Sequence, residues 1–312
     1  MISVCLASYN GEKYIERQLD SILNQNLPVD EVIICDDRST DGTVQICKDF
    51  IRKNNLENWN VYVNDKNVGF CLNFYGAIEK SKGDYIFVCD QDDEWLPSKT
   101  EEMVKTLKNN PDIKVLSSRY DVIDENSKII ENSGVTYLGD KFDGSIEYLT
   151  EESFIGCSYI RGFSLCFTAD IKKYIKKIDL KDLMAHDWLI CMIGCIVGKT
   201  AVLNTKLAHY RYHLDNVSLS AMNKQNRKRS IEKRIRGIKQ SVEGHSYIMS
   251  LSDNKQPIKK FIDFENKRIK FLERKNIFTF ISLGFSLKQY NRYYMGNGLR
   301  VYLGDFAYAF GK

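Results

Sequence analysis

The first 120 residues alternate short apolar runs with longer amphipathic stretches. An apolar run of about five residues, closed by polar or small residues, predicts a buried β-strand. Such runs lie at residues 2–7, 31–35, 85–89 and 114–118, and residues 59–63 alternate as a further strand. Apolar residues spaced three and four apart predict helices between them, at about residues 14–24, 43–53, 72–80 and 97–109. This alternation predicts an α/β fold with a mostly parallel sheet covered on both faces.

The remainder of the chain follows a different pattern. Residues 119–220 are less regular and hold two predicted helices, near residues 169–177 and 186–198. From about residue 221 the pattern is helical and basic, and a second helix of this region is predicted over residues 257–275. We therefore expect one α/β domain over residues 1–220, with halves of about 1–118 and 119–220. A helical C-terminal region should follow over residues 221–312.

Charge separates the same two parts. Residues 221–312 hold 20 Lys and Arg against 7 Asp and Glu, a net charge of +13. Residues 1–220 hold the remaining 25 basic and 34 acidic residues, a net charge of −9. An acidic part indicates metal chemistry or an acid site, whereas a basic part suits phosphate, nucleic acid or an anionic membrane surface.

Several protein classes are excluded by composition and by the start of the chain. A hydrophobic fraction of 43% and a charged fraction of 28% are ordinary for a globular protein. The first residues lack the basic segment and apolar core of a signal peptide. The longest apolar runs, at 188–198 and 277–287, are about half the length of a membrane-spanning helix. Nine cysteines without a C-x-x-C motif fit reduced thiols, so we expect a cytoplasmic protein.

Cys191 and Cys195 lie one helical turn apart near His186, which is one arrangement for zinc. The apolar run around them favours a place in the core instead.

Polar residues cluster directly after three of the predicted strands, where the ligand of a parallel sheet is expected. These clusters are Ser8-Tyr9-Asn10, Asp36-Asp37 and Asp90-Gln91-Asp92-Asp93. The last places three carboxylates within four residues, and a hard divalent cation would relieve their repulsion. A helix N-terminus before Pro97 is the alternative reading of these acids.

Asp37 is the second candidate for chemistry. A carboxylate at a strand tip can accept the N3–H of a uracil or thymine ring, whereas Ser39 or Asp41 suits a helix cap. No G-x-G-x-x-G follows the first strand and no G-x-x-x-x-G-K-[ST] occurs. The chain therefore lacks the signatures of a dinucleotide dehydrogenase and of a P-loop NTPase.

Together these segments resemble glycosyltransferase family 2, over about residues 1–218. The matching segments are Ala7-Ser8-Tyr9-Asn10-Gly11, Ser21-Ile22-Leu23-Asn24-Gln25, EVIICDDRSTDGT at 31–43, Asn67-Val68-Gly69 with Asn73, and DQDDEW at 90–95. The opening YNGEKYIERQLDSILNQ, the DQDDEW segment and the later HDW look most like bacterial rhamnosyltransferase-type members. The resemblance implies the GT-A fold, a Rossmann-like sheet flanked by helices, here with a basic helical extension.

The resemblance also implies roles for individual residues. Asp37 matches the contact to the pyrimidine base, Asp90 and Asp92 match the metal-binding D-x-D, and Asp187 matches the general base of inverting members. The nucleotide-binding positions it implies are Ala7, Ser8, Tyr9, Asn10, Asp37, Asn67, Gly69, Asp90 and Gln91. Those implied for the diphosphate and acceptor loops are Asp93, Arg211, His213, Arg161 and Gly162. Two departures from the family pattern are Ala7, where relatives often have Thr, and the acceptor segment Arg161-Gly162-Phe163-Ser164.

These residues suit an inverting, metal-dependent glycosyltransferase using Mg²⁺ or Mn²⁺. A metal stabilises the departing diphosphate, and a carboxylate accepts the proton of the acceptor hydroxyl. The expected donor is a UDP- or dTDP-sugar, with rhamnose indicated by resemblance alone. The expected acceptor is a glycan or a lipid-linked sugar of surface polysaccharide. A helix-capping role for Asp187 and a surface position for His213 stay open.

Two other classes stay open. A sugar-phosphate nucleotidyltransferase also has such a sheet and acidic site, but usually carries a Gly-rich basic loop after the first strand. A non-enzymatic protein could bind anionic surfaces through residues 224–239, which hold eight basic residues. No RNA-reading signature or zinc finger occurs, so we expect no specific nucleic acid.

We expect residues 221–312 to contact an anionic membrane at the inner face of the cell. Their last stretch adds aromatic residues that suit an interface: Phe278, Phe280, Phe285, Tyr290, Tyr293 and Tyr294. Packing of these aromatics onto the catalytic domain, or onto a second subunit of a homo-oligomer, is the alternative.

Overall fold

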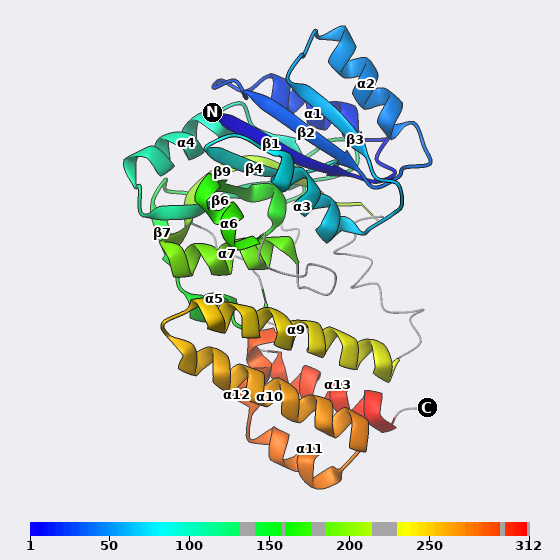
Figure 1. The fold of residues 1–312 in the computed structure, drawn as a ribbon, viewed down its shortest axis with the longest axis vertical. Helices are drawn as coiled ribbons and strands as arrows, with labels where there is room; N and C mark the ends of the chain where they lie inside the picture. Colours follow the sequence, from blue (N-terminus) through cyan, green and yellow to red (C-terminus); the bar gives the residue numbers. More distant parts are fainter. Residues whose placement is uncertain (132–140, 158–159, 176–184, 214–229, 294–296, 311–312) are drawn as a thin grey trace.

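A computed structural model describes residues 1–131, 141–157, 160–175, 185–213, 230–293 and 297–310. Its central feature is one mixed sheet with strand order β3-β2-β1-β4-β8-β6-β9-β5, and β7 pairs with β9 (Figure 1). The parallel half consists of β1 (Ile2–Ser8), β2 (Glu31–Asp36), β3 (Trp59–Val63) and β4 (Tyr85–Asp90). The other strands are β5 (Glu94–Trp95), β6 (Ile113–Ile123), β7 (Ile146–Leu149), β8 (Leu165–Thr168) and β9 (Lys199–Arg211).

Helices cover both faces of the sheet because alternate residues of its strands point to opposite sides. Val4 and Leu6 of β1 share a core with α1 (Ile15–Leu23), α2 (Thr43–Lys53) and α4 (Lys99–Asn109). Cys5 and Ala7 share the opposite core with α3 (Phe70–Lys80) and α7 (His186–Val197). Short helices α5 (Glu151–Phe154) and α6 (Lys172–Ile175) pack against α7. The predicted α/β fold is confirmed.

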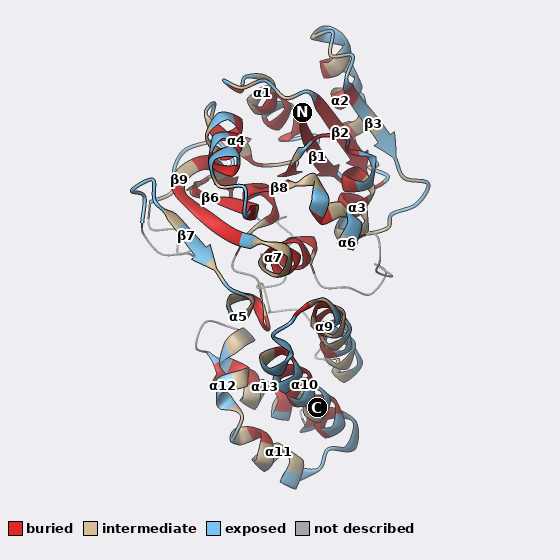
Figure 2. Ribbon diagram, turned by 60° about the vertical axis from the view of Figure 1, so that its left-hand side comes forward, coloured by how far each residue is buried: buried red, intermediate tan, exposed pale blue. Residues whose placement is uncertain are grey.

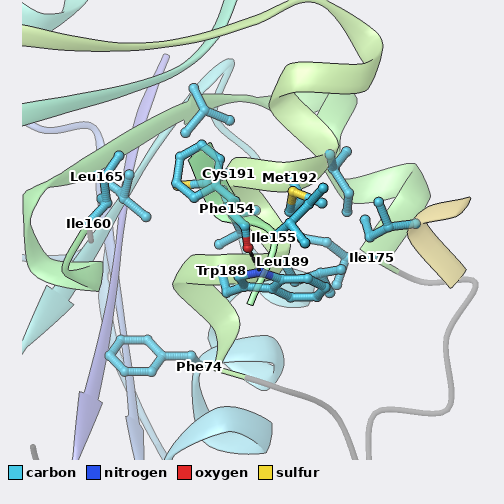
Figure 3. Close-up of a cluster of buried hydrophobic side chains, with 14 of the residues drawn as sticks. Phe74, Phe154, Ile155, Ile160, Leu165, Ile175, Trp188, Leu189, Cys191 and Met192 are labelled. Atoms are coloured by element: carbon cyan, nitrogen blue, oxygen red, sulfur yellow. Dashed lines mark hydrogen bonds between the residues drawn. The ribbon is translucent and has the colours of Figure 1, made fainter. Parts of the chain in front are cut away.

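The apolar helix α7 is the centre of the second core. The Trp188 indole N–H donates to the Phe154 carbonyl oxygen at 2.8 Å, and Cys191 lies among apolar neighbours (Figure 3). The thiol of Cys195 donates to the Leu149 carbonyl. Both cysteines are therefore accounted for by packing and backbone contacts.

The C-terminal region is helical, as predicted. Its helices are α9 (Ile231–Leu251), α10 (Lys255–Arg274), α11 (Ile277–Gly284), α12 (Leu287–Tyr290) and α13 (Gly298–Phe310). They pack against the α5 and α7 side of the sheet, and their core is continuous with it (Figures 1 and 2). His245 links the two parts, because its ring lies 4.8 Å from the Trp188 ring and its Nε2 accepts the Gly156 N–H at 3.2 Å.

Some elements differ from the expectations. Residues 114–118 lie within the longer strand β6. Neither β8 nor β9 was predicted, because β8 is only four residues long and polar residues interrupt the apolar positions of β9. The helix expected near residues 169–177 begins as a 3-10 turn, Ala169–Ile171, before α6. The expected domain boundary at residue 220 lies outside the described residues. Within the described ranges no helix is both long and apolar enough to cross a membrane.

Candidate active site

The site begins where β1, β2 and β4 end. Their register pairs Ala7 with Asp90 and Ser8 with Asp36, so the three polar clusters predicted from the sequence meet at one edge. The Tyr9 backbone N–H donates to Gln91 Oε1 at 2.8 Å, and Gln91 Nε2 donates to the Tyr9 carbonyl at 3.1 Å. These reciprocal bonds fix the loop after β1 against the tip of β4 and leave the Tyr9 ring exposed.

Gly11 leaves room for the Gln91 side chain in this loop. A Cβ atom on Gly11 would overlap the Gln91 side-chain amide, so a larger residue would displace the clamp on Tyr9. Asn10, which precedes Gly11, has a left-handed backbone (φ 49°), and its Oδ1 accepts the Thr40 N–H at 2.8 Å. The loop after β1 is thereby also joined to the loop after β2.

The two aspartates at the end of β2 have different partners. Asp36 is fully buried and accepts hydrogen bonds from the Ser8 hydroxyl (2.8 Å) and the Ser39 backbone N–H (2.7 Å). Asp37 Oδ1 accepts from Val68 N–H at 2.7 Å, and its Oδ2 accepts from Gly69 N–H at 2.8 Å. Asp37 therefore organises the loop before α3.

Asp37 itself is only 2% exposed, and the base contact expected of it stays a prediction. Its Oδ1 also accepts from Asn64, whereas its Oδ2 has Gly69 as its one partner among the described residues, and a carboxylate oxygen has room for two. Gly69 adopts φ +87°, a conformation that favours glycine, and Asn67 beside it is exposed. Ser8 differs from the expectation, because its hydroxyl is turned toward Asp36 and buried.

The acidic cluster after β4 is electrostatically strained. Burial, followed by repulsion from Asp92 and Asp187, raises the pKa of Asp90 well above its usual range. Burial and the charges of Asp92 and Asp90 also raise the pKa of Asp93 well above its usual range. One oxygen of Asp93 accepts the Arg211 backbone N–H at 2.9 Å, whereas its Oδ2 is buried without a hydrogen-bond partner in the described part of the chain.

Asp187 belongs to the same site although it is almost 100 residues away in the chain. It lies in the first turn of α7, whose N-cap is Ala185, so it does not cap the helix. Its Oδ1 accepts the Trp188 N–H at 2.6 Å. Burial raises the pKa of Asp187 to about 6, against the opposing effects of this hydrogen bond and of Arg161.

Arg211 and His213 are both buried beside the acidic cluster. The Arg211 guanidinium donates to the carbonyl oxygens of Asp92 and Asp124, each at 2.8 Å, and pairs with Glu94. It has no solvent-exposed surface, which differs from the diphosphate contact expected of it. His213 Nε2 lies 2.8 Å from Asp92 Oδ2, so it is not the plain surface histidine of the alternative reading.

Arg161 and Gly162 form the opposite side of the site. Arg161 Nε donates to the Tyr120 hydroxyl at 3.1 Å, and the guanidinium lies 4.3 Å from the centre of the Tyr210 ring. Its charge lowers the pKa values of Asp90, Asp93 and Asp187, so it acts electrostatically on all three. A Cβ on Gly162 would overlap the His186 ring, so this close approach requires glycine.

Sequence reasoning missed two residues of this site. Lys99 is fully buried and its Nζ donates to the Phe163 carbonyl at 2.7 Å. Burial lowers the pKa of Lys99 to about 8, although the neighbouring acids oppose this. Its place in an amphipathic helix gave no sign of burial.

His186 is the second of these residues. Its ring stacks on Phe74 with centroids 4.0 Å apart, and burial lowers its pKa to about 3. Both ring nitrogens are buried without a partner among the described residues. The sequence pointed to His186 only as a neighbour of the two cysteines in the zinc reading.

The acidic edge fits a hard divalent cation. Asp90 and Asp92 supply carboxylate oxygens, which Mg²⁺ and Mn²⁺ prefer, and their repulsion is relieved by a positive ion. In the described part of the chain, no group of three or more His, Cys, Asp or Glu side chains is arranged as a complete ligand set. Mg²⁺ usually takes one or two carboxylates and completes its shell with water and phosphate oxygens.

The sheet order and the acidic edge define a GT-A fold, and the chain belongs to glycosyl transferase family 2. The model of that family, described as "Glycosyl transferase family 2", matches residues 3–167, more than half of the chain. Both the expected fold and the expected family are confirmed. The nucleotidyltransferase reading and the non-enzymatic reading lose their support.

Individual relatives are similar to parts of this chain. The dTDP-rhamnosyl transferase RfbG of Shigella flexneri is 33% identical over 193 residues, which is 59% of this chain and 63% of RfbG. The dolichyl N-acetyl-α-D-glucosaminyl phosphate 3-β-D-2,3-diacetamido-2,3-dideoxy-β-D-glucuronosyltransferase of Methanococcus voltae is 27% identical over 167 residues, 52% of this chain and 51% of that enzyme. The chain spans about three fifths (61%) of the length of the first curated relatives it matches.

Solved structures extend the likeness to the C-terminal helices. The S. aureus protein TarS (residues 1–349), in a crystal structure with UDP-GlcNAc, matches 97% of this chain and 81% of that chain with a TM-score of 0.62. At 20% identity, this likeness shows a shared fold.

Proposed function

We propose that this protein transfers a sugar from a UDP- or dTDP-sugar to a hydroxyl group of a glycan or lipid-linked acceptor, with inversion at the anomeric carbon. The observation that carries the proposal is the meeting of Asp90, Asp92 and Asp187 at one edge of the sheet. Asp187 raises the pKa of Asp90 from a distant helix, so the two carboxylates share one electrostatic site.

The donor half of the proposal rests on the loops after β1 and β2. The exposed Tyr9 ring offers a face for a pyrimidine, and the remaining acceptor position on Asp37 Oδ2 suits its N3–H. Asp90 and Asp92 would hold a divalent cation, with Gln91 fixing the loop between them and Tyr9. When bound, the cation neutralises the charge that develops on the leaving diphosphate.

Asp187 serves as the general base in this proposal. A carboxylate with a pKa near 6 is ionised at neutral pH and is more basic than an ordinary aspartate, which suits proton removal from a hydroxyl. One such group supports a single in-line displacement and hence inversion. Arg161 stabilises its ionised form, and neutral His186 offers one donor and one acceptor to sugar hydroxyls.

The relatives guide the choice of substrates. RfbG is named for a dTDP-rhamnosyl donor and TarS was crystallised with UDP-GlcNAc, so both pyrimidine diphosphates belong in the first screen. The Methanococcus enzyme is named for a dolichyl phosphate-linked acceptor, which supports a lipid-linked acceptor here. A cytoplasmic site of action is part of the proposal.

The test is a screen of UDP- and dTDP-sugars with Mn²⁺ or Mg²⁺, measuring donor hydrolysis and transfer to glycan acceptors. We expect nucleoside diphosphate release that excess chelator abolishes and that Asp92→Asn loses. Asp20→Asn, an exposed change on α1, is the matched control and should retain activity. Release of pyrophosphate from a nucleoside triphosphate, or a product of retained configuration by NMR, would overturn the proposal.

A further inference from the structure

The helix α11 forms the end of the molecule opposite the sheet (Figure 1). Two residues separate α11 from α10. Lys275 adopts a left-handed backbone (φ 53°) after α10, and the Asn276 side chain accepts the Phe278 and Thr279 N–H groups at the start of α11. This cap begins α11 directly after the cationic pair Arg274-Lys275.

One face of α11 is fully used in packing. Phe280 stacks on Tyr302 of α13 with centroids 4.2 Å apart and planes 4° apart, and Leu283 is buried. Tyr290, which the sequence offered as an interface aromatic, is buried and donates to Asp305 at 2.9 Å. The side chains of Tyr293 and Tyr294 lie outside the described residues.

The opposite face of α11 is apolar, and its side chains are exposed among the described residues. Phe278 and Phe285 are 78% and 91% exposed, and Ile277 and Ile281 are also exposed. α13, which packs against α11, carries the exposed residues Leu299 and Leu303. We call these six side chains the apolar tip. Exposed aromatic and aliphatic residues on neighbouring helices mark an interaction surface.

Charge around the apolar tip identifies the kind of partner. Residues 274–304 contain five basic residues and no acidic residue, although the average for the chain would place about four acids there. Arg274, Lys275, Lys288 and Arg300 are exposed, and none of them forms an ion pair with a described residue. The tip is therefore an apolar surface surrounded by unneutralised positive charge.

A second copy of the chain fits this surface poorly. A two-fold contact through the tip would bring the cations of both copies together, with no acidic residue of the segment to pair with them. An anionic lipid surface instead provides headgroup phosphates for the cations and acyl chains for Phe278 and Phe285. The apolar run is too short to span a bilayer, so α11 would lie in the plane of the interface.

We propose that the apolar tip is a membrane-docking surface that inserts Phe278 and Phe285 into an anionic lipid leaflet. This narrows the contact expected of residues 221–312 to α11, the start of α13 and the cations around them. The proposal is independent of the glycosyl-transfer proposal, because docking is measured without donor or acceptor.

The test is co-sedimentation of the full chain with vesicles of phosphatidylcholine containing about one third phosphatidylglycerol. We expect binding at low salt that weakens at high salt and on pure phosphatidylcholine. Phe278→Ser with Phe285→Ser should weaken binding by about tenfold or more. Lys275→Glu with Lys288→Glu should weaken it to a similar degree at low salt.

Two matched controls separate the tip from general electrostatics. Lys48→Glu with Lys105→Glu, on α2 and α4, changes the net charge as much as Lys275→Glu with Lys288→Glu does. Phe142→Ser removes an exposed aromatic residue outside the C-terminal helices. Both controls should bind vesicles as the wild type does. Wild-type protein that stays in the supernatant at low salt, or controls that lose as much binding as the tip variants, would overturn the proposal. A dimer that Phe278→Ser with Phe285→Ser converts to a monomer, without vesicle binding, would also overturn it.

Discussion

Two groups of buried charges in this molecule have opposite character. In the C-terminal helices, Asp305 is fully buried and accepts hydrogen bonds from Arg268 (2.7 Å), Arg234 (3.0 Å) and Tyr290 (2.9 Å). At the edge of the sheet, Asp90 and Asp93 are surrounded chiefly by other acids. The pKa of Asp305 is lowered, because its two arginines outweigh the effect of burial, whereas the pKa values of the sheet-edge acids are raised.

The difference separates a structural charge group from a functional one. Each acceptor oxygen of Asp305 is used within the chain, so the group needs no further partner. The acids of the sheet edge are opposed only in part by Arg161 and Lys99, and Asp93 Oδ2 has no hydrogen-bond partner among the described residues. Strained, incompletely paired groups of this kind are typical of sites that await a ligand.

The largest effect is expected from Asp187→Asn. The variant keeps the shape of the side chain but cannot accept the proton, so kcat should fall by about 10²–10⁴. Affinity for UDP or dTDP should be unchanged, because the base acts on the acceptor. Steady-state kinetics and calorimetric titration of the nucleotide measure the two quantities. A loss of nucleotide affinity without a loss of kcat would assign Asp187 to the donor site.

Asp305→Asn should act on stability instead. It removes the carboxylate that Arg268 and Arg234 share, although Arg268 keeps its ion pair with Glu265, and breaking a buried ion pair costs about 3–5 kcal/mol. Urea unfolding followed by circular dichroism would measure the change, with Asp263→Asn on the exposed side of α10 as control. An unfolding free energy equal to that of the wild type would show that the two groups do not differ as described.

The pH dependence of stability should reveal the raised pKa of Asp187. The folded pKa of Asp187 (about 6) lies above the unfolded value of about 3.9. Its contribution to stability is therefore fully present below pH 4 and is lost as the pH rises toward 6. Asp187→Asn should melt above the wild type at pH 8 and close to it near pH 4. The reverse order would contradict the raised pKa.

Activity should follow the same ionisation. Since the base must be unprotonated, kcat should fall about tenfold per pH unit below pH 6 and level off above it. A pH–rate profile measures this acid limb, and a profile that is flat down to pH 4.5 would exclude Asp187 as the base.

The smallest effect is expected at the apolar tip. Phe285→Ser changes a side chain that makes little contact with the rest of the chain, so its unfolding free energy should stay within about 0.5 kcal/mol of the wild type. Thermal unfolding measures this, and transfer to a soluble acceptor should be unchanged. A large loss of stability would mean that Phe285 packs within the fold.

The local pattern of the sequence predicted β1, β2 and β4 well, because their apolar runs are short, continuous and closed by polar loops. β3 was predicted from the alternation of its residues. The local pattern also brought Asp37, Asp90 and Asp92 to one edge. The place of Asp187 in the same site came only from family resemblance, since it depends on how α7 packs on the sheet. Sequence gave no sign that the Arg211 guanidinium turns inward or that Lys99 is buried, because both depend on neighbours distant in the chain.

The interface expected for the C-terminal region also included an aromatic residue, Tyr290, that is buried. Net charge and aromatic content indicated an interface over residues 221–312, but they could not separate Tyr290, which is buried, from Phe285, which is exposed. That distinction depends on which side of each short helix meets α10 and α13.

The most direct test of the account is calorimetric titration of Mn²⁺ into the protein at pH 7.5, with and without UDP or dTDP. We expect one Mn²⁺ per chain, bound more tightly when the nucleotide is present, and affinity at least about tenfold lower in Asp92→Asn. Asp20→Asn should bind as the wild type does. Absence of Mn²⁺ binding under both conditions, or equal binding by Asp92→Asn, would contradict the claim that the acids at the sheet edge form a cation and diphosphate site.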